Sequence, residues 1–225
     1  MLAALPREET YSWGEKLVVP LILWSIFAFL PLRLARRLNS TSLVVAIGQF
    51  MLFRRSAYDQ IGGYADVRSN PVDDLALARK TVAKGLQLSL VDAGRRVRCR
   101  MYRDFSESYA GLSRSLFAAF DYKTGLFALV WSWIVILFLE PLVVLSFRLA
   151  GLPVPDVLTH LAFLGVCLAL LLWGIFCKRF KYPVYLAWLY PVVVLLSGTI
   201  AARSIYLALQ GRVYWKGRKL PAINR

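Results

Sequence analysis

Gly48-Gln49-Phe50-Met51-Leu52-Phe53-Arg54-Arg55 opens the stretch that decides the fold of this chain, and Ile61-Gly62-Gly63-Tyr64 and Val72-Asp73-Asp74-Leu75 complete it. This order predicts a strand, a short helix, a glycine turn, a loop, and then a pair of carboxylates that opens a new helix. Carboxylates at a helix N-terminus lie in the favourable field of the helix dipole. One member of such a pair is well placed to act as a general base, although a pair alone also fits an ordinary acidic first turn.

The residues around the first part of this stretch predict a strand followed by a short helix. Val44–Phe53 is apolar and rich in strand-forming residues, which predicts a buried strand. Ser56 can cap a short helix with Asp59 at the capping-box position, and Gly62-Gly63 is expected to end that helix.

The residues that follow predict a helix, two strands and an amphipathic helix. Asp73-Asp74 opens a helix for which Gly85 is a natural end. Leu86–Leu90 and Val97–Met101 alternate apolar residues with polar or basic ones, which predicts two strands. The apolar residues of Phe105–Phe120 recur at helical spacing, so this helix can lie on a membrane surface.

The composition indicates a membrane protein. Hydrophobic residues make up 58% of the 225 residues, and the formal net charge is +15. Soluble domains are less apolar, and basic residues beside apolar spans favour contact with anionic lipid headgroups. Positive charge also fits nucleic acid, but the sequence carries no nucleic-acid recognition motif, so we expect no nucleic-acid partner.

Apolar runs occur at both ends of the chain. Leu17–Leu32 is short for a crossing, which needs about 20 residues, so it predicts an interfacial or re-entrant helix, with a tilted span as the alternative. The candidate spans near the C-terminus are Gly125–Phe147, Val157–Phe176 and Pro183–Ala202.

The charge distribution conflicts with three crossings. Three spans that start at a cytoplasmic domain place the tail outside, yet the basic tail, with Arg212 and Lys216, favours the cytoplasm. A re-entrant span resolves the conflict, and Glu140-Pro141 is the expected place for a break in the first span. We expect a cytoplasmic tail.

The cysteines and the histidine predict neither a zinc site nor a disulfide framework. Cys99, Cys167 and Cys177 form no C-x-x-C pair, and His160 lies at the start of an apolar run. Small buried cysteines and a helix-end histidine are the expected roles.

The ordered motifs resemble the acceptor-side half of membrane-bound family 2 glycosyltransferases. The Gly48-Gln49, Gly62-Gly63 and Asp73-Asp74 pairs carry this resemblance, together with Arg100-Met101-Tyr102-Arg103 and the tail that begins at Gly211-Arg212. It is closest to the bacterial carotenoid- and hopanoid-associated branch, and more distant from ceramide glucosyltransferases. It covers roughly residues 10–120 and the tail.

The resemblance implies an α/β fold class: a partial GT-A-type glycosyltransferase domain followed by a transmembrane α-helical region. Residues 1–38 would form an interfacial or membrane-associated helix, and residues 39–122 the acceptor-side part of the GT-A domain. Residues 123–225 would form transmembrane helices with a basic tail. The catalytic part would lie on the cytoplasmic side of a bacterial inner membrane.

The resemblance also implies an enzyme that transfers a sugar, with inversion, from a nucleotide-sugar donor to a lipid-like acceptor. Asp74 takes the place of the family's catalytic base, and Asp73 that of its glutamate partner. The positions expected to bind substrates are Gly48, Gln49, Gly62, Gly63, Arg100 and Tyr102.

Two departures from the family refine these expectations. The Gln-x-x-Arg-Trp motif of processive members is absent, and Arg100–Arg103 stands in its place, which favours transfer of a single sugar. The family's nucleotide-binding half, with its Asp-x-Asp site for a divalent metal (magnesium or manganese), is also absent. The chain is therefore expected to be the C-terminal part of an enzyme, and both an active and an inactive fragment stay open.

A second interpretation stays open. A non-catalytic membrane protein could use the basic surface and the amphipathic helices to bind anionic lipid or a separate catalytic subunit. In that case Gly62-Gly63 would be an ordinary helix end, and Arg98 and Arg100 would form a solvated basic edge. Trp215 would be an interfacial anchor instead of part of a tail that covers the active site.

Overall fold

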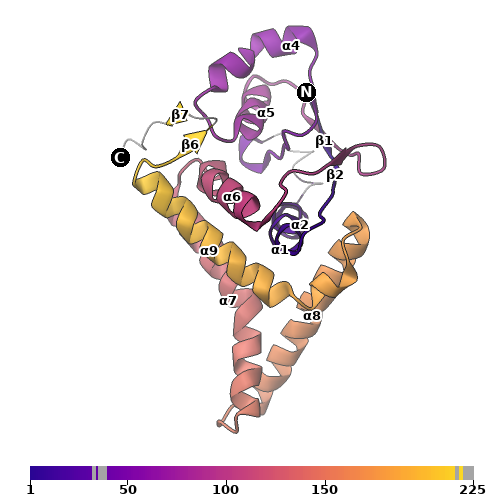
Figure 1. Cartoon of the computed structure of the whole chain (residues 1–225), viewed down its shortest axis with the longest axis vertical. Coiled ribbons are helices and arrows are strands. Elements are labelled where there is room, and N and C mark those ends of the chain that lie inside the picture. The colour runs from indigo at the N-terminus through magenta and orange to yellow at the C-terminus, as the bar shows by residue number, and fades with distance from the viewer. Residues whose placement is uncertain (32–33, 35–39, 216–217, 220–225) are drawn as a thin grey trace.

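The computed structural model describes residues 1–31, 34, 40–215 and 218–219. It is mostly helical, with a few short strands. Figure 1 shows two parts: a cap, formed by the described residues between 1 and 120, and a hairpin of two long helices within residues 124–180. The α/β character expected of residues 39–122 is limited to short strands, which alone do not identify a GT-A domain.

A three-stranded sheet forms the centre of the cap, in the order β3-β1-β4. The central strand is β1 (Leu2–Leu5), which pairs antiparallel with β3 (Met51–Leu52) and parallel with β4 (Ser89–Asp92). A second, two-stranded sheet pairs β2 (Arg7–Glu8) in parallel with β5 (Arg98–Cys99). Of the two strands predicted after residue 85, the first lies later than expected, at Ser89–Asp92, and the second is shorter, at Arg98–Cys99.

The buried strand predicted over Val44–Phe53 is largely wrong. Only Met51–Leu52 is a strand, and the chain before it forms a 3₁₀ turn, η1 (Thr41–Leu43), and an irregular segment. The central position in the sheet is taken by β1. Leu2–Leu5 was not predicted as a strand, because four apolar residues give too short a pattern to distinguish a strand from a helix.

The helices on either side of the glycine turn agree with expectation. They are α4 (Arg55–Gln60) and α5 (Asp73–Ala83), with the 3₁₀ helix η2 (Gly63–Val67) between them. The expected cap of α4 is wrong: the N-terminal cap is Arg54, and it makes no side-chain hydrogen bond to the helix. Asp59 instead accepts from Arg55 Nε at 3.0 Å, one helical turn away.

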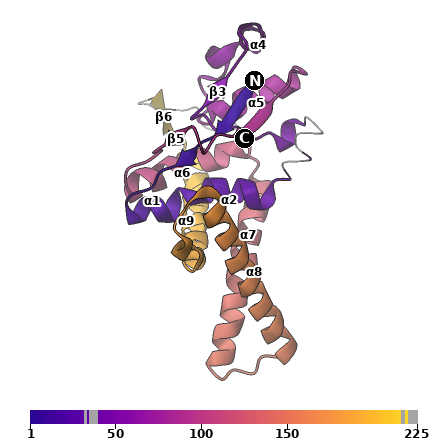
Figure 2. The ribbon, with the colours of Figure 1, turned by 90° about the vertical axis from the view of Figure 1, so that its right-hand side faces the viewer.

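Two consecutive helices lie beneath the sheets. A capping box between Ser12 and Glu15 starts α1 (Trp13–Val18), and α2 (Pro20–Phe29) follows without a charged residue. A helix that is apolar on every side needs an apolar environment. Figure 2 shows α1 and α2 lying across the direction of the hairpin helices, which is the orientation expected of an interfacial helix.

The amphipathic helix predicted from Phe105 is confirmed as α6 (Phe105–Ala119). It packs against α1 and, more extensively, against α9 (Tyr190–Leu209), so its apolar face is covered by protein. The backbone N–H of Phe117 donates to the Ser204 hydroxyl of α9 at 2.9 Å.

The hairpin consists of α7 (Thr124–Leu149) and α8 (Asp156–Phe180), which pack against each other. The break expected at Glu140-Pro141 is wrong, because α7 continues through Pro141. The proline ring lies close to Gly165 of α8, where a Cβ would come within 3.2 Å of Pro141 Cγ. Within a membrane, a packed neighbouring helix makes such a proline tolerable.

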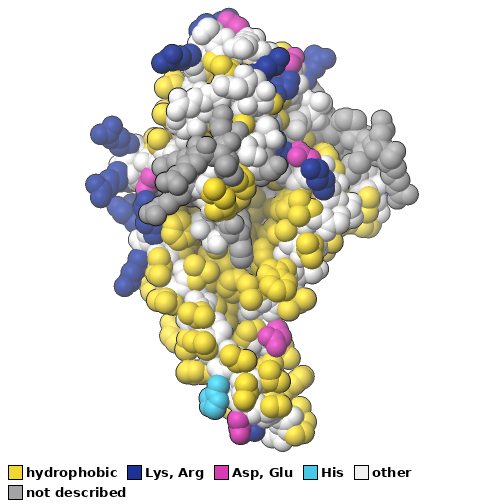
Figure 3. Space-filling model, turned by 180° about the vertical axis from the view of Figure 1, so that it is seen from behind, with side chains coloured by type: hydrophobic (Ala, Val, Ile, Leu, Met, Phe, Trp, Pro, Cys, Tyr) yellow, Lys and Arg dark blue, Asp and Glu magenta, His cyan; other side chains and the backbone are white. Residues whose placement is uncertain are grey.

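Three of the described helices, α7, α8 and α9, are long and apolar enough to cross a membrane. The third begins later than predicted: the 3₁₀ helix η3 (Val184–Ala187) precedes α9. Figure 3 shows hydrophobic side chains over the lower half of the molecule and basic side chains around the cap. Exposed residues of the hairpin include Leu129, Trp133, Leu161 and Phe163.

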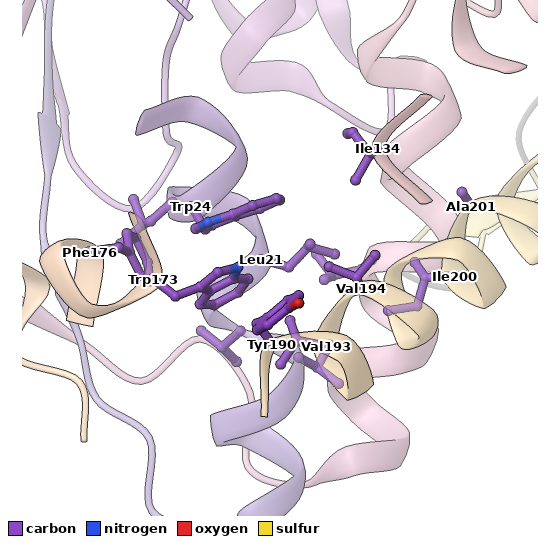
Figure 4. Close-up of a cluster of buried hydrophobic side chains, with 14 of the residues drawn as sticks. Leu21, Trp24, Ile134, Trp173, Phe176, Tyr190, Val193, Val194, Ile200 and Ala201 are labelled. Atoms are coloured by element: carbon purple, nitrogen blue, oxygen red, sulfur yellow. The ribbon is translucent and has the colours of Figure 1, made fainter. Parts of the chain in front are cut away.

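An aromatic cluster joins the cap to the hairpin (Figure 4). Trp24 of α2 stacks on Trp173 of α8 at 4.7 Å between ring centroids and meets Phe138 of α7 edge-on at 5.2 Å. Tyr190, at the start of α9, meets Phe138 at 6.2 Å. Each such aromatic pair contributes roughly 0.5–1.5 kcal/mol beyond area burial, so this cluster fixes α2 against the three long helices.

The C-terminal tail forms an antiparallel pair of short strands, β6 (Tyr214–Trp215) and β7 (Arg218–Lys219). The tail residue Lys216 lies outside the described residues, as does Leu32 at the end of the first apolar run.

Candidate functional site

Asp74 is held by two backbone amides at the start of α5. Its Oδ1 accepts from Leu75 N, and its Oδ2 accepts from Gly48 N, both at 2.7 Å. The structure thus brings together two predicted site residues that lie 26 positions apart. Burial raises the pKa of the Asp74 carboxyl above its ordinary value, and the two amide donors oppose that shift. A carboxylate with a raised pKa is a stronger base.

Gly48 leaves little room for a side chain beside this carboxylate. A Cβ at this position would lie 3.1 Å from Asp74 Oδ2 and 3.2 Å from Asp74 Cβ. A larger residue at this position would therefore push the carboxylate away by a few tenths of an ångström.

The Gly62-Gly63 turn places Tyr64 against Tyr58. Both glycines have positive φ angles, +78° and +56°, and a Cβ at Gly63 would collide with the Tyr58 ring. The backbone N–H of Tyr64 donates to the Tyr58 hydroxyl at 3.0 Å. Burial raises the pKa of Tyr64, and the charges of Asp73 and Asp74 raise it further. Tyr64 was not among the predicted site residues, although it directly follows the glycine pair.

Gln49 and Tyr102 lie near a buried acid that the sequence did not indicate. Glu8 of β2 is only 8% exposed, and burial raises its pKa to about 7, while the nearby Gln49 amide lowers it. Tyr102 is buried against Gly111 of α6, and burial raises its pKa to about 12. In sequence, Glu8 lies within Arg7-Glu8-Glu9, which is typical of a solvated surface segment.

Arg100 contacts a buried carboxylate rather than the acidic pair. Its Nε and Nη2 donate to Glu15 Oε1 at 3.2 and 2.5 Å, and its guanidinium lies 4.9 Å from the centre of the Tyr11 ring. Burial alone would raise the pKa of Glu15, but the hydrogen bonds from Arg100 and from two backbone amides lower it below its ordinary value. Arg100 therefore holds the start of α1 in place.

The described residues supply no cluster for a metal ion. Within residues 1–31, 34, 40–215 and 218–219, no three His, Cys, Asp or Glu side chains gather to hold one. The divalent metal implied by the resemblance thus finds no fitting set of ligands in the described part of the chain.

Comparisons with models of protein families, with curated proteins and with solved structures found no match for this chain. The function is therefore argued from the geometry around Asp74.

Proposed function

We propose that this chain is the acceptor-side, membrane-anchored part of an inverting glycosyltransferase. It would transfer a single sugar from a nucleotide-sugar donor to a lipid-like acceptor. The observation that carries this proposal is the carboxylate of Asp74, which is partly buried, basic for an aspartate and held by Gly48 N. The charges of Asp73 and Asp74 also raise the pKa of the Tyr64 phenol.

The proposed step moves one proton and exchanges one bond. Asp74 takes the proton of an acceptor hydroxyl, and the oxygen attacks the anomeric carbon from the face opposite the diphosphate. The bond between that carbon and the diphosphate oxygen breaks, so the configuration inverts and the nucleoside diphosphate leaves with the bonding electrons. General base catalysis of this kind supplies roughly 10²–10⁴-fold of the rate.

A nucleotide-binding half must complete the proposed enzyme, in the same chain or as a partner. The leaving diphosphate develops negative charge that preorganised cations have to stabilise. The described residues offer no metal cluster for this purpose, so that half would bring the divalent metal expected of the family.

The apolar helices favour a lipid-like acceptor. Arg79 joins α5 to the turn before α7, and α1 and α2 pack against α9 and α8. The helices α7, α8 and α9 are long and apolar enough to cross a membrane. An acceptor with an acyl or isoprenoid tail would keep that tail among apolar side chains while its hydroxyl reaches the cap. The nucleotide sugar would come from the cytoplasm.

The test is an Asp74→Asn variant, assayed with the nucleotide-binding half present. We expect transfer to fall by about 10²-fold or more, because an amide cannot accept the acceptor's proton. Membrane insertion should be unchanged. Asp59→Asn is the matched control, because Asp59 lies at the surface in an ion pair with Arg55. Transfer retained by Asp74→Asn would remove this mechanism.

The net charge of +15 favours a second candidate, a non-catalytic protein that binds anionic lipid or a separate catalytic subunit. A nucleotide-sugar turnover assay separates the two. Turnover that depends on Asp74 supports the enzyme, whereas lipid-dependent recruitment with no turnover supports the second candidate.

A further inference from the structure

Two exposed aromatic side chains meet where α1 lies against the connection between α8 and α9. Trp13, the first residue of α1, is 62% exposed, and Tyr185 of η3 is 41% exposed. Their ring centroids lie 5.4 Å apart. Tryptophan is on average a well-buried residue, so an aromatic pair left at the surface calls for a partner outside the chain.

The helix η3 extends this apolar surface. Side chains three positions apart share one face of a 3₁₀ helix, so Tyr185 and Trp188 point the same way. The backbone N–H of Trp188 donates to the Tyr185 carbonyl at 3.1 Å, and its side chain is 73% exposed. Val184 is also exposed, whereas Leu186 and Ala187 are buried. One side of η3 therefore packs on the protein, and the other presents apolar side chains outward.

A lysine stands beside the aromatic pair. Lys16 lies three positions after Trp13 on α1, and its Nζ is 5.6 Å from the centre of the Trp13 ring. This distance is within the range of a cation–π contact. The ring and the lysine stem are apolar, and the amine carries a positive charge at one end. The surface is therefore amphipathic rather than purely apolar.

The neighbouring charges are positive as well. Glu15, between Trp13 and Lys16, is fully buried and pairs with Arg100, so it adds no negative charge to the surface. Lys178 and Lys181 are exposed at the end of α8, just before η3.

The position of η3 indicates the kind of partner. It joins α8 to α9, and both helices are long and apolar enough to cross a membrane. A surface at the junction of two such helices stays beside the bilayer. Tryptophan and tyrosine concentrate at the interface between membrane and water, and lysine extends its amine from apolar surroundings to the headgroups. These properties favour lipid headgroups over a soluble protein.

We propose that Trp13, Lys16 and Tyr185 form an anchor that binds the phospholipid headgroup layer on the cap side of the membrane. Lys16 would bind lipid phosphate, and the two rings would lie among the glycerol and carbonyl groups. The anchor would hold α1 and η3 at one depth and so fix the height of the cap above the bilayer. It requires no sugar transfer and goes beyond the proposed function.

The test measures the depth of a nitroxide label at Val184→Cys, which leaves all three anchor residues in place. The full chain, with its own cysteines replaced, is reconstituted in vesicles of phosphatidylcholine and phosphatidylglycerol. The label's collision rate with oxygen, which concentrates in hydrocarbon, is divided by its rate with a water-soluble nickel chelate. Arg55→Cys is the reference for water, and Leu168→Cys, an exposed site halfway along α8, is the reference for hydrocarbon.

We expect the ratio at Val184→Cys to lie between those of the two references. A ratio equal to that of Arg55→Cys overturns the anchor and leaves this surface to a soluble partner. A ratio equal to that of Leu168→Cys also overturns it, because the surface would then lie in the hydrocarbon core.

A second measurement tests the anchor residues themselves. Trp13→Ser combined with Lys16→Gln should move the ratio at Val184→Cys toward the water reference. Trp133→Ser is the matched control, because Trp133 is 61% exposed on α7 and lies outside the anchor. An unchanged ratio in the double variant, or an equal shift in Trp133→Ser, overturns the anchor. The thermal midpoint in detergent, where no bilayer is present, should stay the same and shows that the double variant is folded.

Discussion

One backbone amide links the irregular segment before β3 to the start of α5. Gly48 N donates to Asp74 Oδ2, and a Cβ at Gly48 would lie only 3.1 Å from that oxygen. The position of the proposed base therefore depends on a residue that has no side chain of its own.

Gly48→Ala should weaken sugar transfer more than it weakens the fold. The new Cβ would displace the Asp74 carboxylate by a few tenths of an ångström, and we expect about a tenfold loss of transfer from misplacement of the base. Transfer is assayed with the nucleotide-binding half present. Gly125→Ala is the control, because a Cβ there meets nothing within 4 Å. Equal activity of the two variants would show that the Gly48 contact does not position the base.

Glu8 is a second acid, after Asp74, whose pKa is raised by burial. The groups that face it are Gln49, Cys99, Tyr102 and Tyr182, and none of them supplies a positive charge. Burial is the first cause of its raised pKa. The folded protein therefore favours the protonated acid.

The free energy of unfolding should fall as the pH rises from about 4.5 to about 7, the ordinary and the raised pKa of Glu8. The folded carboxyl keeps its proton up to about pH 7, whereas the unfolded one releases it near 4.5, so the folded state binds more protons between these values. The free energy of unfolding should decrease across this window by up to about 3 kcal/mol. Thermal unfolding in detergent at several pH values measures it. Glu8→Gln should flatten the profile and Glu9→Gln should not; an unchanged slope in Glu8→Gln contradicts the assignment.

At the scale of elements, α5 is tied to the turn between α6 and α7. Arg79 donates to the Ala119 carbonyl at 2.8 Å and pairs with Asp121. Asp121 and Tyr122 both have left-handed backbone angles, φ of 51° and 59°, which are uncommon for residues other than glycine. The helix that carries the acidic pair is thus fixed to the start of the first long helix.

The α7–α8 contact allows a matched comparison of two glycines on one helix. A Cβ at Gly165 would lie 3.2 Å from the rigid Pro141 ring, whereas a Cβ at Gly174 meets nothing within 4 Å. Alanine is favoured over glycine within a helix by up to about 1 kcal/mol. Gly174→Ala should therefore keep or raise the thermal midpoint in detergent, and Gly165→Ala should lower it. Identical midpoints for the two variants would show that the hairpin is loosely packed at Pro141.

At the scale of the whole molecule, α9 returns to the cap rather than running to the hairpin tip. Its first residue, Tyr190, contacts Phe138 in the middle of α7, and the Ser204 hydroxyl accepts from the backbone N–H of Phe117 in α6. Figure 1 shows α9 running from the middle of the hairpin to the cap. The guanidinium of Arg203 lies 5.1 Å from the Tyr109 ring of α6. These contacts favour two crossings, by α7 and α8, and a re-entrant α9.

This arrangement predicts that the C-terminal tail lies on the same side as the cap. Single cysteines at Arg212, Arg55 and Leu152, in a chain whose own cysteines are replaced, would be labelled with a membrane-impermeant thiol reagent. Arg212→Cys and Arg55→Cys should react from one side of sealed vesicles, and Leu152→Cys, between α7 and α8, from the other. Labelling of Arg212→Cys together with Leu152→Cys would mean that α9 crosses.

The sequence predicted those elements whose signals are local. The acidic pair starts α5, and the positive φ of Gly85 follows its end, because caps and helix propensity act within a few residues. The long apolar helices were predicted for the same reason, since hydropathy is a property of the segment itself. Of the candidate site, the pattern predicted Asp74 and its neighbours by type and spacing, but not their contacts.

Tertiary structure alone decided the features that depend on distant partners. Leu2–Leu5 became the central strand because residues near 51 and 90 pair with it. Arg100 donates a hydrogen bond to Glu15, which lies 85 positions earlier in the chain. The helix α7 continues beyond Pro141, where α8 packs against it. Glu8 is buried where β2 pairs with β5, and this burial raises the pKa of its carboxyl. Burial and long-range pairing arise when segments far apart in sequence meet, and no local pattern records which segments will do so.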